Sequence, residues 1–163
     1  MDRLTPQQRH TVMSHIRSTD TQPEWRVRRM VFAMGFRYRL HAKTLPGRPD
    51  LVFPRQRKAI FVHGCFWHSH GCRHGGRLPA TRRAFWAEKL VRNHARDQKV
   101  LRQLWQAGWR VLVVWECETG DPERLRARLA DFLAAPARPV NYDLDDQHAL
   151  YGLVAETNLE PLG

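Results

Sequence analysis

Two apolar runs, Asp50-Leu51-Val52-Phe53-Pro54 and Lys58-Ala59-Ile60-Phe61-Val62-His63, decide the fold of this chain. Each has the length of a buried strand, and a proline closes the first because it cannot donate a hydrogen bond inside a sheet. Only the basic residues 55–57 separate the two runs. Such a short connection predicts a tight hairpin.

The sequence on both sides of this hairpin predicts further helices and strands. Capping residues, a proline and an acid over residues 19–24 indicate a helix start, and the helix is expected to end at Gly35. Alternating apolar and basic residues predict a strand over 36–41, after which residues 45–49 form a turn. We further expect helices over residues 5–17, 81–106 and 122–133, and a strand over 109–116. The order predicts an α/β domain with a mixed sheet over residues 1–134, followed by a tail over 135–163.

The charge of the chain points to a polyanionic partner. Its 163 residues carry a formal net charge of +11, with arginine dominating lysine. Arginine favours two-point contacts with phosphates and bases, so nucleic acid comes before a membrane surface. A basic surface without a function is the alternative. No apolar run is long enough to span a bilayer, and three cysteines in a metal-like setting fit a reducing cytoplasm better than disulfides.

The segment from His63 to Cys72 contains two thiols and three imidazoles. With Cys117, it offers the four nitrogen and sulfur donors of a closed tetrahedral zinc site, which would stabilise the fold. The spacing alone leaves His68, His70 and His74 open as the imidazole ligand. Cys117 could instead be a buried free thiol.

Asp50 is the candidate catalytic acid. A lone carboxylate at the start of a strand can hold Mg²⁺, although it could also only cap a turn. Glu24 could supply a second acid, or merely a favourable charge at a helix start. His63 and His68 could take a proton from water or position it, unless they are spare ligands or surface residues.

Phe66 and Trp67 lie beside the predicted zinc ligands, and Phe85-Trp86 opens a predicted helix. Aromatic rings held by a metal site can enter a base stack and open it, most easily at a mismatched pair. For Phe85 and Trp86 the alternative is a place in the core. The sequence therefore predicts an aromatic wedge next to the Asp50 cleft.

Several motifs together resemble one nuclease family. A Pro-Asp pair about ten residues before a second strand is similar to the PD-(D/E)xK nuclease core, although Phe61-Val62-His63 replaces its acid-x-Lys element. Over residues 5–133 the chain resembles the very short patch repair (Vsr) endonucleases. The motifs that carry this resemblance are Leu45-Pro46-Gly47-Arg48-Pro49-Asp50, His63-Gly64-Cys65-Phe66-Trp67-His68, Pro79-Ala80-Thr81-Arg82, Phe85-Trp86-x-Glu88-Lys89, and Gly108-Trp109-Arg110-Val111-Leu112-Val113-Val114-Trp115-Glu116-Cys117.

The resemblance implies a restriction-endonuclease-like fold and an enzyme that nicks one DNA strand beside the thymine of a T·G mismatch left by deamination of 5-methylcytosine. It implies a catalytic Mg²⁺ held by Asp50 and the main-chain carbonyl of Val62, with His68 activating water and His63 and Glu24 assisting. It also assigns structural zinc to Cys65, His70, Cys72 and Cys117, and DNA contacts to Met13, Phe66, Trp67 and Trp86. Val62 replaces a threonine of the family pattern, which keeps a carbonyl ligand but removes any hydroxyl role.

We expect a monomer that acts on double-stranded DNA in the bacterial cytoplasm, near the nucleoid, with mismatch-repair proteins as further partners by family resemblance. Two other classes of protein remain open on the sequence. A zinc-stabilised DNA-binding module would have no use for an acid in a cleft. A restriction-type enzyme that cuts both strands would need a second active site, and hence a dimer.

Overall fold

The computed structural model describes residues 7–8, 19–76 and 78–136. Most of the expected helix over residues 5–17, including Met13, and nearly all of the expected tail lie outside the described residues. Within them, one four-stranded mixed sheet has the strand order β1-β2-β3-β4. Its strands are β1 (Arg39–Leu40), β2 (Leu51–Phe53), β3 (Lys58–His63) and β4 (Arg110–Trp115).

The predicted hairpin is confirmed. β2 pairs antiparallel with β3, with Leu51 opposite Ile60. The connection is a short 3-10 turn, η1 (Pro54–Gln56), followed by Arg57 in the left-handed region with a φ of 50°. β3 then pairs in parallel with β4, so the chain must cross over between the two strands, and the crossover contains the long helix α3 (Arg83–Gln106).

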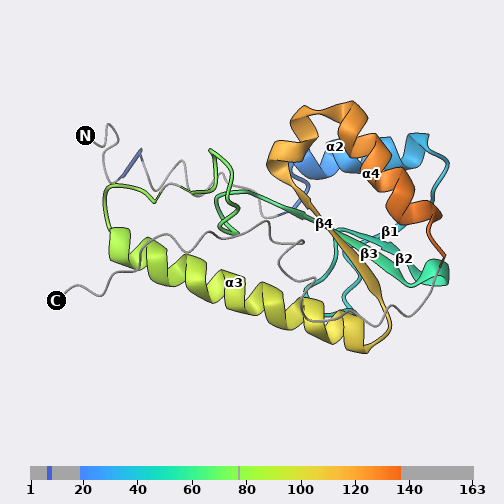
Figure 1. Cartoon of the computed structure of the whole chain (residues 1–163). Helices are drawn as coiled ribbons and strands as arrows, with labels where there is room; N and C mark the ends of the chain where they lie inside the picture. The colour runs from blue at the N-terminus through green and yellow to red at the C-terminus, as the bar shows by residue number, and fades with distance from the viewer. Residues whose placement is uncertain (1–6, 9–18, 77, 137–163) are drawn as a thin grey trace.

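Helices cover both faces of the sheet. α2 (Gln22–Ala33) and α4 (Pro122–Ala134) lie on one face and α3 lies on the other (Figure 1). Successive side chains of a strand point to opposite faces, so Ile60 packs with α2 and α4 whereas Phe61 packs with α3. Burial on both faces explains why β3 and β4 are nearly continuous apolar runs.

A buried lysine ties α4 to the sheet. Lys58 opens β3 and is 1% exposed. Its Nζ donates hydrogen bonds of 2.6 Å to the carbonyl oxygens of Leu133 and Ala135. These carbonyls have no partners within a helix, and a cation there also favours the helix dipole. The end of α4 is therefore held by a side chain of the central hairpin.

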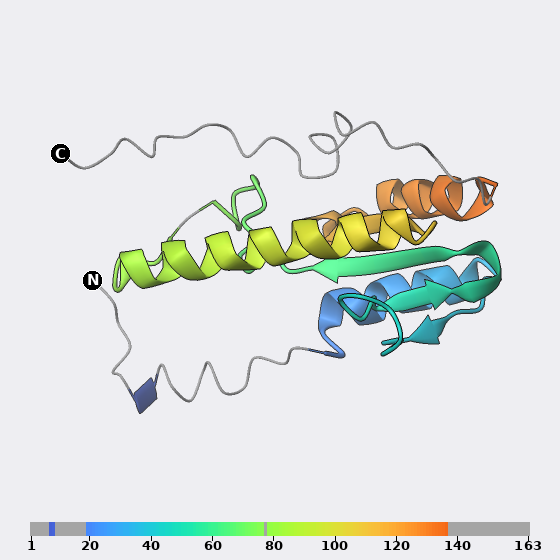
Figure 2. The same ribbon diagram turned by 90° about the horizontal axis from the view of Figure 1, so that it is seen from below.

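Two predicted boundaries were wrong. The strand expected over residues 36–41 pairs only at Arg39 and Leu40, because its partner β2 is itself three residues long. The helix expected from Thr81 begins at Arg83, with Arg82 in the left-handed region at its N-cap position. Figure 2 shows that the N-terminal half of α3 extends beyond the strands, alongside the loop that follows β3. No helix in the described part of the chain has the length and apolar character needed to cross a membrane.

Candidate active site and metal centre

A cavity of about 520 Å³ lies between the sheet and α3. All five residues expected to take part in catalysis or to bind Mg²⁺ line it, namely Glu24, Asp50, Val62, His63 and His68. They come from the start of α2, the turn before β2, the end of β3 and the loop after it. The fold thus brings together residues that are up to about forty positions apart, as the sequence predicted. His41, Arg96 and Asp97 line the same cavity and were not predicted.

Asp50 is held at the wall of this cavity by the hairpin. Its Oδ2 accepts a hydrogen bond of 2.7 Å from the backbone N–H of Val62. Burial raises the pKa of Asp50 to about 6, against the opposing effect of the Val62 N–H, and the nearby charge of Glu24 raises it further. An ionised carboxylate there is costly without a cation beside it. Carboxylate and carbonyl oxygens are ligands that Mg²⁺ prefers, so the residues present fit that ion.

His68 forms a pair with an acid of α3. Its Nδ1 is hydrogen-bonded to Oδ2 of Asp97, which is buried. Burial acts to raise the pKa of Asp97, but the hydrogen bond and the charge of His68 outweigh it and lower that pKa below its ordinary value. An ionised Asp97 accepts a hydrogen bond from Nδ1–H of His68, so in the neutral ring the other nitrogen, Nε2, is the acceptor.

His63 lies directly against this pair. Its ring stacks on the ring of His68, with centroids 3.8 Å apart and planes 8° apart. Burial, helped by the neighbouring charge of His68, lowers the pKa of His63 to about 3. A ring that stays neutral near neutral pH fits the positioning of His68 better than uptake of a proton.

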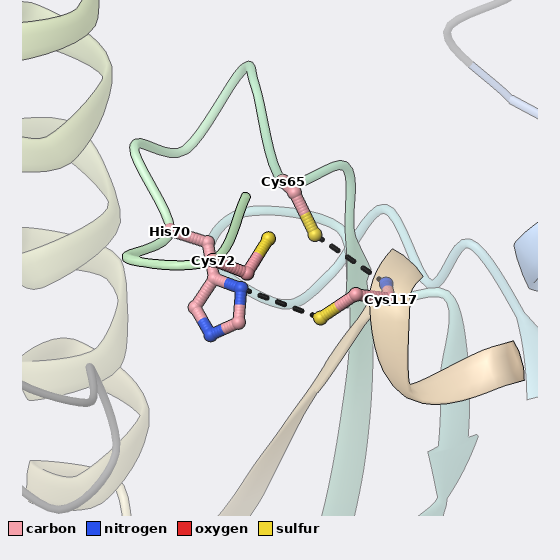
Figure 3. Close-up of side chains that lie close together, drawn as sticks. All are labelled: Cys65, His70, Cys72 and Cys117. Atoms are coloured by element: carbon pink, nitrogen blue, oxygen red, sulfur yellow. Dashed lines mark hydrogen bonds between the residues drawn. The ribbon is translucent and has the colours of Figure 1, made fainter. Parts of the chain in front are cut away.

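The four predicted zinc ligands lie close together. Cys65, His70 and Cys72 come from the loop after β3, and Cys117 comes from the 3-10 turn η2 (Glu116–Gly120) after β4 (Figure 3). One donor atom from each lies within 4.8 Å of the other three. Burial raises the pKa of the Cys65 thiol, so its thiolate requires a neighbouring cation. Two or three thiolates with an imidazole suit zinc.

The structure resolves which imidazole joins the cysteines. The ring of His68 faces Asp97, and Nε2 of His74 accepts a hydrogen bond from Arg73. Only His70 belongs to the cysteine cluster of the described residues, where its Nδ1 lies 3.5 Å from Sγ of Cys117. Its ring stacks on Trp115 of β4 at 4.2 Å, which fixes the orientation of the donor. Backbone bonding tightens the loop further, because the N–H of His70 donates to the carbonyl of Cys65.

Three aromatic rings contact one another and form what we call the aromatic cluster: Phe66, Trp67 and Trp86. Their centroids lie 5.1 to 6.0 Å apart. Nζ of Lys89 lies 5.2 Å from the ring centroid of Trp67, and Asn93 donates a hydrogen bond to the carbonyl of that tryptophan. None of the three rings is fully buried, which argues against a role purely in the core. Trp67 directly precedes His68, which lines the cavity.

Comparison with known proteins places this arrangement in a family. The family model of the DNA mismatch endonuclease Vsr matches residues 1–74. The type II nicking enzyme V.XorIIP of Xanthomonas oryzae is 51% identical over 132 residues, which cover 81% of this chain and 96% of the relative. The DNA mismatch endonuclease Vsr of Escherichia coli is 38% identical over 143 residues, covering 85% of this chain and 91% of the relative. The chain belongs to the Vsr family.

Vsr membership confirms the family predicted from the motifs and identifies the chain as a member of a family of DNA endonucleases. A nuclease of this family is expected to use a divalent metal. A further similar protein, the type II nicking enzyme V.NmeAIP of Neisseria meningitidis, is 41% identical over 128 residues, which cover 78% of this chain and 91% of the relative.

Two helices carry polar residues of the site that the sequence analysis missed. The buried residues of α3 are Leu90, Asp97, Leu101 and Leu104, so Asp97 lies on the apolar stripe of its helix. The buried residues of α2 are Glu24, Val27, Arg28 and Val31, which places an ion pair on an otherwise apolar face. A charged residue at a core position of a helix is the signal that could have identified Asp97 and Arg28.

Proposed function

We propose that this Vsr-family chain nicks one strand of double-stranded DNA next to the thymine of a T·G mismatch that arises by deamination of 5-methylcytosine. One observation carries the proposal: an acid suited to Mg²⁺ and an Asp97-supported histidine share a cavity. The residue before that histidine, Trp67, belongs to the aromatic cluster. The names of the relatives, which are nicking enzymes and a mismatch endonuclease, support it. We interpret the sheet as a restriction-endonuclease-like core.

In this proposal the carboxylate of Asp50 and the carbonyl oxygen of Val62 would hold Mg²⁺. The bound ion would neutralise the charge that develops on the phosphate and its leaving oxygen. Nε2 of His68 takes the proton of the attacking water, while the carboxylate of Asp97 keeps the ring in the required tautomer. His63 supports the ring of His68 by stacking.

Glu24 assists from the start of α2, where it lines the same cavity. Its carboxylate accepts hydrogen bonds of 2.9 Å from the backbone N–H of Asp20 and from the hydroxyl of Thr21. These bonds hold the side chain at the start of α2, where its charge is favourable to the helix dipole. From there Glu24 can orient water in the cavity that it shares with Asp50.

Zinc has a structural role in the proposal. With four protein ligands, Cys65, His70, Cys72 and Cys117, the site has no open position for a reactant. It ties the loop after β3 to the end of β4, and the same loop carries Phe66, Trp67 and His68. Zinc would thus fix the positions of the aromatic cluster and His68 relative to each other.

Phe66, Trp67 and Trp86 would enter the base stack from the major groove, and the family pattern places Met13 opposite them in the minor groove. Opening a stack costs a few kcal/mol, and less at a mismatched pair, so a rigid wedge selects for mismatches. We further propose a monomer that acts on nucleoid DNA in the bacterial cytoplasm, with mismatch-repair proteins as partners. One active site on one chain then produces one nick.

The test is incubation of the zinc-loaded protein with Mg²⁺ and either a supercoiled plasmid or a strand-labelled duplex that contains a single T·G pair. The proposal expects a nick beside the mismatched thymine and no cut in the matched T·A duplex. No cut with retained binding would indicate a DNA-binding module, and a double-strand break would indicate a restriction-type enzyme.

Variants assign the roles. Asp50→Ala should abolish nicking and leave binding of the T·G duplex largely intact, so normal nicking by this variant would refute the catalytic assignment. Cys72→Ser should lose zinc and thermal stability. Full zinc occupancy in Cys72→Ser would refute the proposed ligand set.

A further inference from the structure

Arg28 of α2 is a buried cation that neither the sequence motifs nor the proposed mechanism uses. It is 3% exposed, and its guanidinium contacts three different side chains. Nη1 lies 2.6 Å from Oδ1 of Asp20, and Nη2 lies 2.8 Å from Oε2 of Glu24 and 3.0 Å from Nε2 of His41. A buried charge is costly unless it is paired, so this position requires an explanation.

The guanidinium fixes the tautomer of His41. Arginine has only donors, so Nε2 of His41 must accept, and in the neutral ring the proton then lies on Nδ1. Nδ1 is 3.9 Å from Oδ1 of Asp50. Arg28 therefore directs an N–H dipole of His41 towards the carboxylate that the proposed function assigns to Mg²⁺.

Arg28 also holds Glu24 in place. Asp20, Glu24 and Asp50 are three acids at one end of the cavity region, and they would repel one another without a cation among them. The hydrogen bond from Arg28 to Oε2 of Glu24 restricts the rotation of that carboxylate. The guanidinium thus offsets the repulsion and sets the direction of the carboxylate.

Backbone conformation supports a functional reason for this arrangement. Asp20 and His41, two of the three partners of Arg28, are both held in the left-handed region, with φ values of 56° and 45°. Non-glycine residues adopt that region at a cost and persist there only when the surroundings hold them. Both strained residues bond to the same guanidinium.

We propose that Arg28 is a positioning residue of the active site, which fixes Glu24 and the Nδ1–H tautomer of His41 on the Asp50 side of the cavity. The inference rests on the proposed function and deepens it. It also explains the cluster of Asp20, Glu24 and His41, whose donor atoms lie within 4.8 Å of one another. Arg28 acts there as the resident cation, so the cluster needs no second metal ion.

The test compares Arg28→Met, which removes the charge and keeps an unbranched stem, with Arg28→Lys, which keeps the charge but has no fork to reach several partners. Arg29→Met is the matched control, because Arg29 is the exposed neighbour on the same helix. Each protein is measured for kcat and KM on a T·G duplex, for the Mg²⁺ concentration at half-maximal nicking, and for binding of Mg²⁺ alone by calorimetry.

We expect Arg28→Met to lower kcat by about 10- to 100-fold and to change the affinity for Mg²⁺, since the acids lose their resident cation, with KM for DNA within about twofold of wild type. Arg28→Lys should recover part of the loss, and Arg29→Met should match wild type. A folded Arg28→Met protein with wild-type kcat and Mg²⁺ binding would overturn the inference.

Where Arg28→Met does not fold, a second pair of variants, His41→Gln and His41→Phe, tests the inference. Glutamine can accept from Arg28 and donate towards Asp50, whereas phenylalanine can do neither. His41→Gln should therefore retain more kcat than His41→Phe by about 10-fold, and equal kcat values would overturn the inference. If wild type does not nick the T·G duplex, the proposed function fails, and the calorimetric comparison of Arg28→Met with Arg29→Met still decides the role of Arg28.

Discussion

In the proposed function Asp97 acts through its hydrogen bond to Nδ1 of His68. In Asp97→Asn the amide NH2 group can donate to Nδ1, which favours the wrong tautomer of the ring. We expect kcat for nicking to fall by about 100-fold or more, with binding of the T·G duplex unchanged. The measurement is single-turnover nicking beside a binding titration. Asp131→Asn, at an exposed position of α4, is the control, and equal rates for the two variants would contradict this role.

The raised pKa of Asp50 makes stability depend on pH. The pKa is about 6 in the folded protein against an ordinary value of 3.8, so the folded state binds more protons between these values than the unfolded state does. The free energy of unfolding should therefore fall as pH rises through this window, by at most about 3 kcal/mol from this group, since a partly exposed carboxylate is screened.

This effect can be isolated with Asp50→Asn, which does not titrate at that position. Denaturant unfolding of zinc-loaded protein without Mg²⁺ should show that the variant gains stability relative to wild type from about pH 4 to about pH 7. Adding Mg²⁺ should narrow the gap, because the ion binds the ionised carboxylate of the folded state. A gap that is constant over this pH range would contradict the raised pKa.

How much of the site the sequence could predict depends on where each residue lies. Asp50, His63 and His68 belong to the hairpin and the loop after it, so local pattern and chain order were enough to place them in one cavity. Asp97 and Arg28 lie within long helices, where a charged residue ordinarily faces water. Only the packing of α3 and α2 against the sheet buries these two side chains, and it brings Asp97 to the cavity.

At the scale of the element, the loop after β3 depends on close approach of its own backbone. A Cβ added to Gly75 would lie 2.1 Å from the carbonyl oxygen of His70, whereas one added to Gly76 would meet nothing nearer than 3.7 Å. Gly75→Ala should therefore displace His70 and lower zinc occupancy and the thermal midpoint, and Gly76→Ala should change neither. Zinc content and thermal unfolding measure both effects. Equal zinc content in the two variants would contradict the prediction.

The elements themselves were predictable where one local signal dominated. Buried strands β3 and β4 are continuous apolar runs, and α2 carries a capping threonine and Gly35 at its ends. The length of the edge strand β1 was overestimated. Alternating apolar and basic residues over 36–41 indicate which side chains face the core, and they do not indicate whether the backbone pairs with another strand. Phe36 and Tyr38 do pack against the core, yet the short β2 offers them no partner in the ladder.

At the scale of the whole molecule, the net charge should set the affinity for any DNA duplex, and the aromatic cluster should set the preference for a mismatched one. A net charge of +11 attracts any duplex through its phosphates, and this attraction weakens steeply with salt. In the proposed function the aromatic cluster enters the base stack, so it should add preference for a mismatch. Raising salt from about 50 to about 200 mM is thus expected to weaken binding of T·G and T·A duplexes alike, by orders of magnitude.

Trp67→Ala should instead reduce the ratio of the two affinities, T·G over T·A, by about 10-fold and leave the salt dependence unchanged, because it removes a stacking ring and no charge. Phe32→Ala is the control, since Phe32 is 56% exposed on α2 and lies outside the aromatic cluster. Fluorescence anisotropy with both duplexes over a salt series measures the ratio and the slope together. A Trp67→Ala protein that keeps the wild-type ratio would show that mismatch preference arises elsewhere in the molecule, and a changed slope would show that the variant disturbs the phosphate contacts.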